Sequence, residues 1–140
     1  MDKIMVAVDG SGHARKAIAL AARLARDCGA ELALLYVDTP GPFTGEVADF
    51  AQTEDLARGD VIDWIFESAE REARSAGAPT ITREVGSGDA AEGVLQAIEE
   101  QKPDLLVMGA RGLSDLEGLV FGSVSHKVLH LTTVPCLIAR

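Results

Sequence analysis

The sequence predicts an α/β fold, a doubly wound (Rossmann-like) sheet of five parallel strands covered by four helices. Two observations support this prediction. Short, almost wholly apolar runs alternate with longer segments of helical periodicity along the whole chain. In addition, the first third of the chain is strand, helix, strand, which a right-handed parallel crossover normally joins. We expect the strand order 3-2-1-4-5 and a single domain over residues 1–140, a length that suits one compact core.

The first half of the chain contains two strands and one helix before an irregular stretch. Residues 3–8 form an apolar run, as expected for a strand that is buried on both faces. Residues 14–28 place alanine, isoleucine and leucine on one helical stripe, and Gly29 ends that helix. The second strand is expected over 32–37. Residues 38–57 are rich in proline, glycine and scattered acids, so we expect a loop there.

The second half continues the alternation. Residues 80–85 alternate apolar and polar side chains, which suits a strand at the edge of the sheet. Asp89 has the residue type and position of a helix cap, and Pro103 closes the helix that Asp89 opens. The remaining elements are expected as helices over 61–76, 91–98 and 124–131, and as strands over 104–108 and 135–139.

Composition and charge exclude several classes of partner. The formal net charge is −9, whereas nucleic acids and anionic membranes recruit basic surfaces, so we expect neither as the main partner. The chain has two cysteines, no CxxC spacing and no secretory leader after Met1, which favours the reducing cytoplasm. Cys28 and Cys136 are therefore expected as small buried apolar side chains without a disulfide.

A glycine and serine pattern near the C-terminus points to phosphate binding. Gly109 and Gly112 are followed, nine residues later, by Gly122-Ser123-Val124-Ser125. Glycine lets backbone N–H groups approach a phosphate closely, and the start of the following helix carries partial positive charge. In the alternative interpretation, the glycines serve a turn and close packing, and Ser123 only caps the helix.

The predicted strand order brings a second signal to this loop. Strands one and four become neighbours, so Asp9 faces the 109–125 loop at the point where strand order reverses. Asp9 has an alternative role as the cap of the first helix. The patterns Gly10-Ser11-Gly12 and Gly86-Ser87-Gly88 match dinucleotide motifs incompletely, so turn and cap chemistry is favoured for both.

Taken together, these motifs resemble the ATP-binding signature of the universal stress protein family. The resemblance rests on the G-x-x-G, nine residues, G-S spacing from Gly109, on Val8-Asp9-Gly10-Ser11 after the first strand, on Val37-Asp38 after the second, and on the terminal run 134–138. It covers essentially the whole chain. The family contains members that bind ATP and members that do not, and the glycines and serine that distinguish the binding members are present here.

The resemblance implies where ATP would bind. Asp9 and Val37 would line the adenine side, and the 109–125 loop would receive ribose and phosphates; Arg111 either reaches a phosphate or is solvated. Magnesium, as a companion of ATP, would be held through water by Asp9 and Asp38. Asp115 and Glu117 depart from the common pattern, and acids near a triphosphate weaken its binding. The full expected site is Ala7, Val8, Asp9, Val37, Met108, Gly109, Arg111, Gly112, Gly122, Ser123, Val124 and Ser125.

No set of general base, activated nucleophile and leaving-group stabiliser is evident, so we expect binding rather than turnover, with weak ATPase activity at most. The resemblance implies a nucleotide-responsive regulator in the stress response. The last strand is expected at an apolar sheet edge, which predicts a homodimer through 134–139, with an unidentified protein partner in addition. The alternatives are a slow ATPase or adenine-nucleotide hydrolase, and an interaction module that binds AMP, cyclic AMP or no nucleotide.

Overall fold

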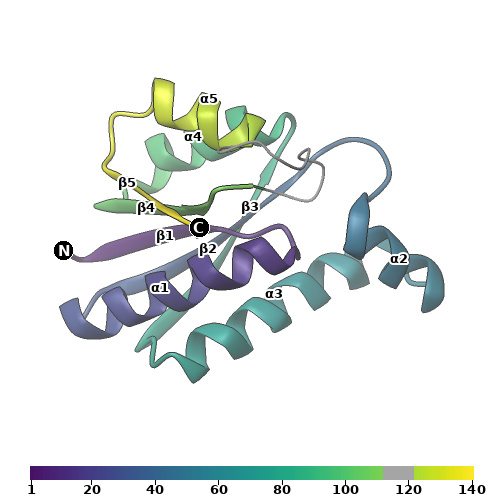
Figure 1. Cartoon of the computed structure of the whole chain (residues 1–140), viewed down its shortest axis with the longest axis horizontal. Coiled ribbons are helices and arrows are strands. Elements are labelled where there is room, and N and C mark those ends of the chain that lie inside the picture. The colour runs from purple at the N-terminus through teal and green to yellow at the C-terminus, as the bar shows by residue number, and fades with distance from the viewer. Residues whose placement is uncertain (112–121) are drawn as a thin grey trace.

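The computed structural model describes residues 1–111 and 122–140. Their strands form one parallel sheet in the order β3-β2-β1-β4-β5, which confirms the predicted topology (Figure 1). The edge position expected for the third strand is also confirmed. The strands are β1 (Lys3–Ala7), β2 (Glu31–Asp38), β3 (Thr80–Ser87), β4 (Leu105–Gly109) and β5 (Cys136–Ala139).

Helices cover both faces of the sheet. In Figure 1, α1 and α3 lie on one side and α4 and α5 on the other. These two layers enclose two separate clusters of buried apolar residues, one against each face. The helices are α1 (Gly12–Cys28), α2 (Gly45–Thr53), α3 (Arg58–Ser75), α4 (Ala90–Gln101) and α5 (Ser123–Leu131).

The central strands are buried on both faces because their side chains alternate between two apolar layers. In β1, Ile4 and Val6 face the α1/α3 layer, and Met5 faces the α4/α5 layer. In β2, Leu34 and Leu35 divide in the same way and are almost fully buried. This explains why the strands read as continuous apolar runs in the sequence, without polar alternation.

The prediction of four helices is wrong, because part of the expected loop over 38–57 folds as α2. Val47 is the buried residue of this helix and contacts the turn at Gly10. Phe50 stacks on Trp64 of α3, with ring centroids 4.1 Å apart. Ala51 also packs against the core, but the apolar positions Val47, Phe50 and Ala51 span a single turn. A stripe this short does not reveal a helix in the sequence.

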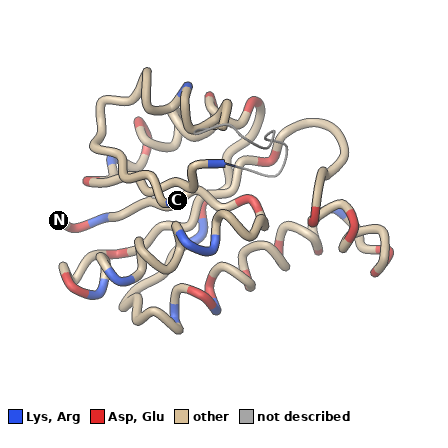
Figure 2. Tube along the Cα trace, in the orientation of Figure 1, with Lys and Arg blue, Asp and Glu red and all other residues tan. Residues whose placement is uncertain are grey.

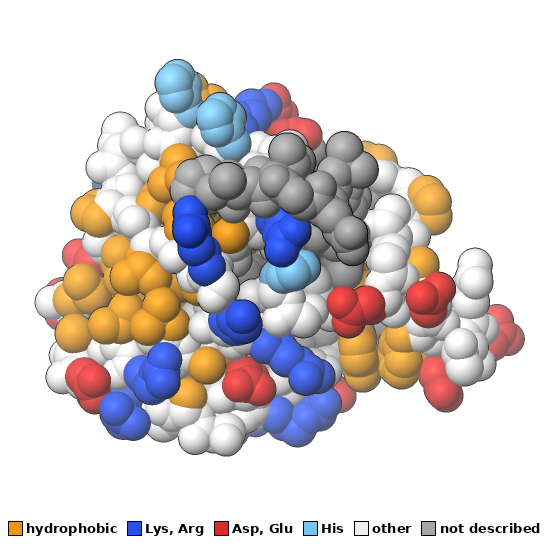
Figure 3. All heavy atoms as spheres, viewed as in Figure 1, with side chains coloured by type: hydrophobic (Ala, Val, Ile, Leu, Met, Phe, Trp, Pro, Cys, Tyr) orange, Lys and Arg blue, Asp and Glu red, His pale blue; other side chains and the backbone are white. Residues whose placement is uncertain are grey.

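Positive charge is concentrated on one helix although the net charge is −9. Arg15, Lys16, Arg23 and Arg26 of α1 are exposed. Figure 2 shows basic positions along the trace of α1, and Figure 3 shows basic side chains gathered on the face seen in that view. Acidic residues are spread over α2, α3 and α4 (Figure 2).

Two further expectations can be checked in the described residues. Cys28, expected to be buried, is exposed at the last turn of α1, whereas Cys136 is half-buried; neither forms a disulfide. Among the helices of the described segments, none has both the length and the apolar character required to cross a membrane.

Candidate functional site

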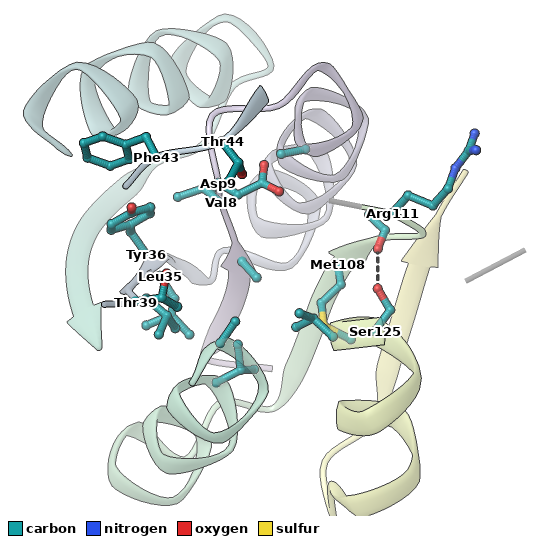
Figure 4. A pocket seen from close by; sticks show the side chains of 17 residues that line it. Val8, Asp9, Leu35, Tyr36, Thr39, Phe43, Thr44, Met108, Arg111 and Ser125 are labelled. Carbon is teal, nitrogen blue, oxygen red and sulfur yellow. Dashed lines mark hydrogen bonds between the residues drawn. The ribbon is translucent and has the colours of Figure 1, made fainter. Parts of the chain in front are cut away.

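A cavity of about 210 Å³ opens at the carboxyl ends of the strands, where the strand order reverses between β1 and β4. Its walls come from the ends of β1, β2 and β4, the segment after β2, and the first turns of α1, α4 and α5. Figure 4 shows the labelled side chains around it, with Val8 and Asp9 opposite Met108 and Ser125. Ligands bind at this position in open α/β sheets, so the topology and the cavity indicate the same place.

The turn after β1 holds Asp9 at the rim of the cavity. The Asp9 carboxylate accepts a hydrogen bond from the Ser11 backbone N–H, with Oδ1 2.8 Å from N. Ser11, not Asp9, caps α1, because its Oγ accepts from the Ala14 N–H at 3.2 Å. Gly10 has φ +83°, and a Cβ there would lie 2.6 Å from Val47 Cγ2. Glycine at this turn thus lets α2 pack against the rim.

The β2 wall presents one polar group among apolar side chains. Tyr36 lines the cavity and its ring meets Phe66 edge to face, with centroids 6.3 Å apart. Burial raises the pKa of the Tyr36 phenol, and the Asp38 and Asp9 carboxylates raise it further against the lowering effect of Arg58. The Tyr36 hydroxyl is therefore protonated at neutral pH and can donate a hydrogen bond into the cavity.

Val37 also lines the cavity and is fixed by close contact with α4. A Cβ added at Gly93 would lie 2.5 Å from Val37 Cγ1, closer than packed carbon atoms approach. Gly86, the β3 neighbour of Val37, has little room on the same side, with Val37 Cγ2 3.4 Å from a hypothetical Cβ. The two glycines thus allow Val37 to stand between β3 and α4 at the cavity wall.

The opposite wall joins the end of β4 to the start of α5. The Ser125 hydroxyl donates to the Gly109 carbonyl oxygen at 2.9 Å. A Cβ at Gly109 would lie 3.2 Å from the His13 carbonyl oxygen, so this glycine also allows the first turn of α1 to approach. Gly122 is the N-cap of α5, and the first hydrogen bond of that helix runs from the His126 N–H to the Gly122 carbonyl. The backbone N–H groups of residues 123–125 come before this first hydrogen bond, so they have no acceptor within the helix, as at every helix N-terminus.

The structure brings most of the sequence-predicted site residues together. Gly122 and Ser123 stand at the start of α5 but do not line the cavity, and Gly112, like Asp115 and Glu117, lies outside the described residues. The Arg111 side chain extends away from the cavity in Figure 4. The predicted residues that line the cavity are Ala7, Val8, Asp9, Val37, Met108, Gly109, Arg111, Val124 and Ser125.

Sequence reasoning missed the wall that follows β2. Thr39, Phe43 and Thr44 line the cavity although they belong to the stretch expected to be an irregular loop. The proline and glycine pattern from residue 40 to residue 42 reveals a turn but not which of its neighbours face inward. Five further lining residues belong to helices and strands, and nothing in the sequence indicates a role for them beyond packing. They are Ala14, Leu35, Tyr36, Ala90 and Val94.

Asp38, expected to hold magnesium with Asp9, is engaged in an ion pair. The Arg58 guanidinium donates from Nε and Nη2 to Asp38 Oδ1, the former at 3.0 Å. The hydrogen bond with Asp38 raises the pKa of Arg58. Within 1–111 and 122–140, no cluster of three or more histidine, cysteine, aspartate or glutamate side chains is arranged to hold a metal ion.

Comparison with known proteins assigns the family. The model of the universal stress protein family matches residues 1–140. The chain belongs to the universal stress protein family. Universal stress protein YxiE of Bacillus subtilis is 36% identical over 154 aligned positions that span 99% of each protein. A universal stress protein of Thermus aquaticus is 36% identical over 139 positions, covering 98% of this chain and 97% of the relative.

Solved structures of universal stress proteins share the fold. One is a crystal structure in complex with cAMP, which is 27% identical in sequence to this chain and has a TM-score of 0.75. The match covers 99% of this chain and 96% of that one. A second, from Lactobacillus plantarum, has a TM-score of 0.80 at 23% identity, with 99% of this chain matched to 97% of that one. The resemblance drawn from the sequence motifs is therefore confirmed at the level of family and fold.

Proposed function

We propose that this universal stress protein binds ATP in the cavity between β1 and β4 and acts as a nucleotide-responsive regulator in the stress response. The observation that supports this most strongly is the meeting, in one cavity, of segments far apart in the sequence: residues 7–9, Val37, the end of β4 with Arg111, and the first turn of α5. Each segment belongs to the motif set predicted for ATP. A structure in which they lined different surfaces would not support the proposal.

The lining of the cavity suits the two ends of a nucleotide. Val8, Val37 and Met108 offer apolar surface for a purine, and the Tyr36 hydroxyl can orient it. Gly109 and the N-terminus of α5 form the phosphate side, where helix amides and the helix dipole favour negative charge. Because the Ser125 hydroxyl hydrogen is used by Gly109, we assign its phosphate contact to the backbone amide.

The remaining predicted residues complete this proposed site. Asp9 bounds the adenine side, and Gly112, Gly122 and Ser123 extend the phosphate side with Val124. We place magnesium on the phosphates and water rather than on Asp38, because that carboxylate already pairs with Arg58. Occupancy of the site would change the surface that the protein offers to an unidentified protein partner.

The ligand specificity is tested by titration calorimetry of nucleotide-stripped protein with ATP, AMP and cyclic AMP, with and without magnesium. We expect one ATP per chain, bound more tightly than AMP or cyclic AMP, with no ADP formed on prolonged incubation. If cyclic AMP bound more tightly than ATP, cyclic AMP would be the ligand instead. This outcome is worth testing because a related structure holds cAMP. Steady ADP formation would favour the slow ATPase, and no binding by any of the three would contradict the proposed function.

We also propose a homodimer formed through β5, the last strand, which forms one edge of the sheet. Leu137 packs against one apolar layer and Ile138 against the other, so the strand offers its backbone edge to a second copy. Size-exclusion chromatography with light scattering should give the mass of two chains. A mass of one chain at high protein concentration would refute this arrangement.

We place the protein, acting as one domain over residues 1–140, in the cytoplasm. Both thiols are unpaired, and that of Cys28 is exposed. Exposed free thiols persist in reducing compartments and are oxidised outside them. Burial raises the pKa of the Cys136 thiol, which keeps it protonated and unreactive at neutral pH.

A further inference from the structure

Arg58, the first residue of α3, binds the segment that follows β2 at several points. Its Nη1 donates to the Gly41 carbonyl oxygen at 2.8 Å, and its Nη2 donates to the Thr39 carbonyl oxygen at 2.7 Å. The same guanidinium pairs with the Asp38 carboxylate. Its central carbon lies 4.5 Å from the centroid of the Phe43 ring, within the range of a cation–π contact. One side chain therefore fixes four residues of the segment 38–43.

The same segment forms a wall of the cavity. Thr39, Phe43 and Thr44 line it, whereas Arg58 does not. In Figure 4 the Phe43 ring extends from the rim away from the centre of the cavity, and it is this ring that the Arg58 guanidinium contacts. Arg58 thus contacts the wall without itself lining the ligand space.

The segment has little regular structure of its own to hold it. It connects β2 to α2 without helix or strand over residues 39–44, and Gly41 has φ +100°. The Thr39 and Gly41 carbonyl groups point to the guanidinium instead of to a backbone donor. A planar guanidinium with five donors can serve two carbonyls and a carboxylate at once, which an ammonium group cannot do in the same geometry.

We propose that Arg58 is a positioning residue that sets the affinity of the cavity for its nucleotide without touching the nucleotide. This inference rests on the proposed function. A wall already held in its binding conformation spares the ligand the entropy loss of ordering it. In the ion pair with Asp38, 38% of the Arg58 side chain is exposed to solvent. Solvent therefore screens the pair, which adds little to global stability. Its effect should therefore appear in binding rather than in unfolding.

The test compares Arg58→Gln with Arg83→Gln. Arg83 is the control because it also pairs with carboxylates, those of Glu70 and Asp63, and lies over a phenylalanine ring, that of Phe66. It does not itself line the cavity, and its hydrogen bonds go to Glu70 rather than to the segment 38–43. By calorimetry we expect ATP affinity to fall about five- to tenfold in Arg58→Gln and to stay within twofold in Arg83→Gln, with similar small changes in melting temperature. Arg58→Lys should recover part of the loss.

A second measurement reports on the wall without any ligand. Chymotrypsin cleavage after Phe43, followed by mass spectrometry on the nucleotide-free protein, should be faster in Arg58→Gln than in wild type or Arg83→Gln. Equal ATP affinity in wild type and Arg58→Gln would overturn the proposal, as would equal cleavage. If wild type bound no adenine nucleotide, the proposed function and the role in affinity would both fail, while the cleavage rates would still decide whether Arg58 holds the wall.

Discussion

Replacing Ala90 by tryptophan is expected to weaken nucleotide binding at least about a hundredfold, which corresponds to about 2.7 kcal/mol. Ala90 is the first residue of α4, is half-buried and lines the cavity of about 210 Å³. An indole at this position would fill space that the ligand needs. The fold should survive, because the first turn of a helix tolerates tryptophan and the cap formed by Asp89, whose side chain accepts from the Glu92 N–H, remains.

Titration calorimetry with ATP on wild type and Ala90→Trp provides the measurement. Gln96→Trp is the matched control, because Gln96 lies on the same helix but is exposed and does not line the cavity. We expect this control to bind ATP as wild type does. If Ala90→Trp retained full affinity in a folded protein, the nucleotide would have to bind somewhere other than this cavity.

Replacing Phe66 by alanine is expected to lower the free energy of unfolding by about 3–5 kcal/mol. Phe66 is among the largest fully buried side chains, with 2% of its surface exposed, and its ring supports Tyr36 from below the cavity wall. The substitution removes the apolar burial and leaves a void that the surrounding strands cannot close completely. Urea denaturation should show a lower midpoint with an unchanged slope.

The control for this prediction is Phe50→Ala, the same change at a half-buried position. Phe50 stacks on Trp64 at 4.1 Å between centroids, so its loss should cost about 1 kcal/mol. Phe66→Ala should in addition weaken ATP binding in the fraction that stays folded, because Tyr36 loses its support. Equal stability losses in the two variants would show that Phe66 does not occupy the tightly packed position that the structure gives it.

The fold could be predicted almost entirely from the sequence because its central strands are buried on both faces. Runs such as Ile4–Val8 leave no polar alternation, and crossovers between parallel strands follow a fixed hand. The helix α2 escaped prediction because its apolar positions, Val47, Phe50 and Ala51, span only a single turn. An apolar stripe of one turn is too short to distinguish a helix from a loop in the sequence.

The candidate site was predictable where it rests on backbone geometry. Glycines such as Gly109, and the turn at Asp9, mark places where the chain must turn or approach closely, and such places are visible in a sequence. The wall formed by Thr39, Phe43 and Thr44 was not, because its position depends on hydrogen bonds from Arg58. A long-range contact from an arginine on another element has no local sequence pattern.

Ser125 shows that the sequence can locate a hydroxyl group without revealing its hydrogen-bond partner. A hydroxyl at the start of a helix beside glycines was expected to donate to a phosphate, and in the structure it donates to the Gly109 carbonyl. The residue therefore ties α5 to the end of β4, while the backbone amides around it remain in the place expected for phosphate binding. Residue type indicated the location correctly but not the direction of the hydrogen bond.

Native mass spectrometry of freshly purified protein, with extraction and identification of any retained nucleotide, decides whether the cavity binds an adenine nucleotide. Wild type and Ala90→Trp are measured side by side, before and after addition of ATP. We expect one adenine nucleotide per wild-type chain and none on Ala90→Trp. Wild-type protein that carries no nucleotide and shows no mass shift with added ATP would contradict this expectation.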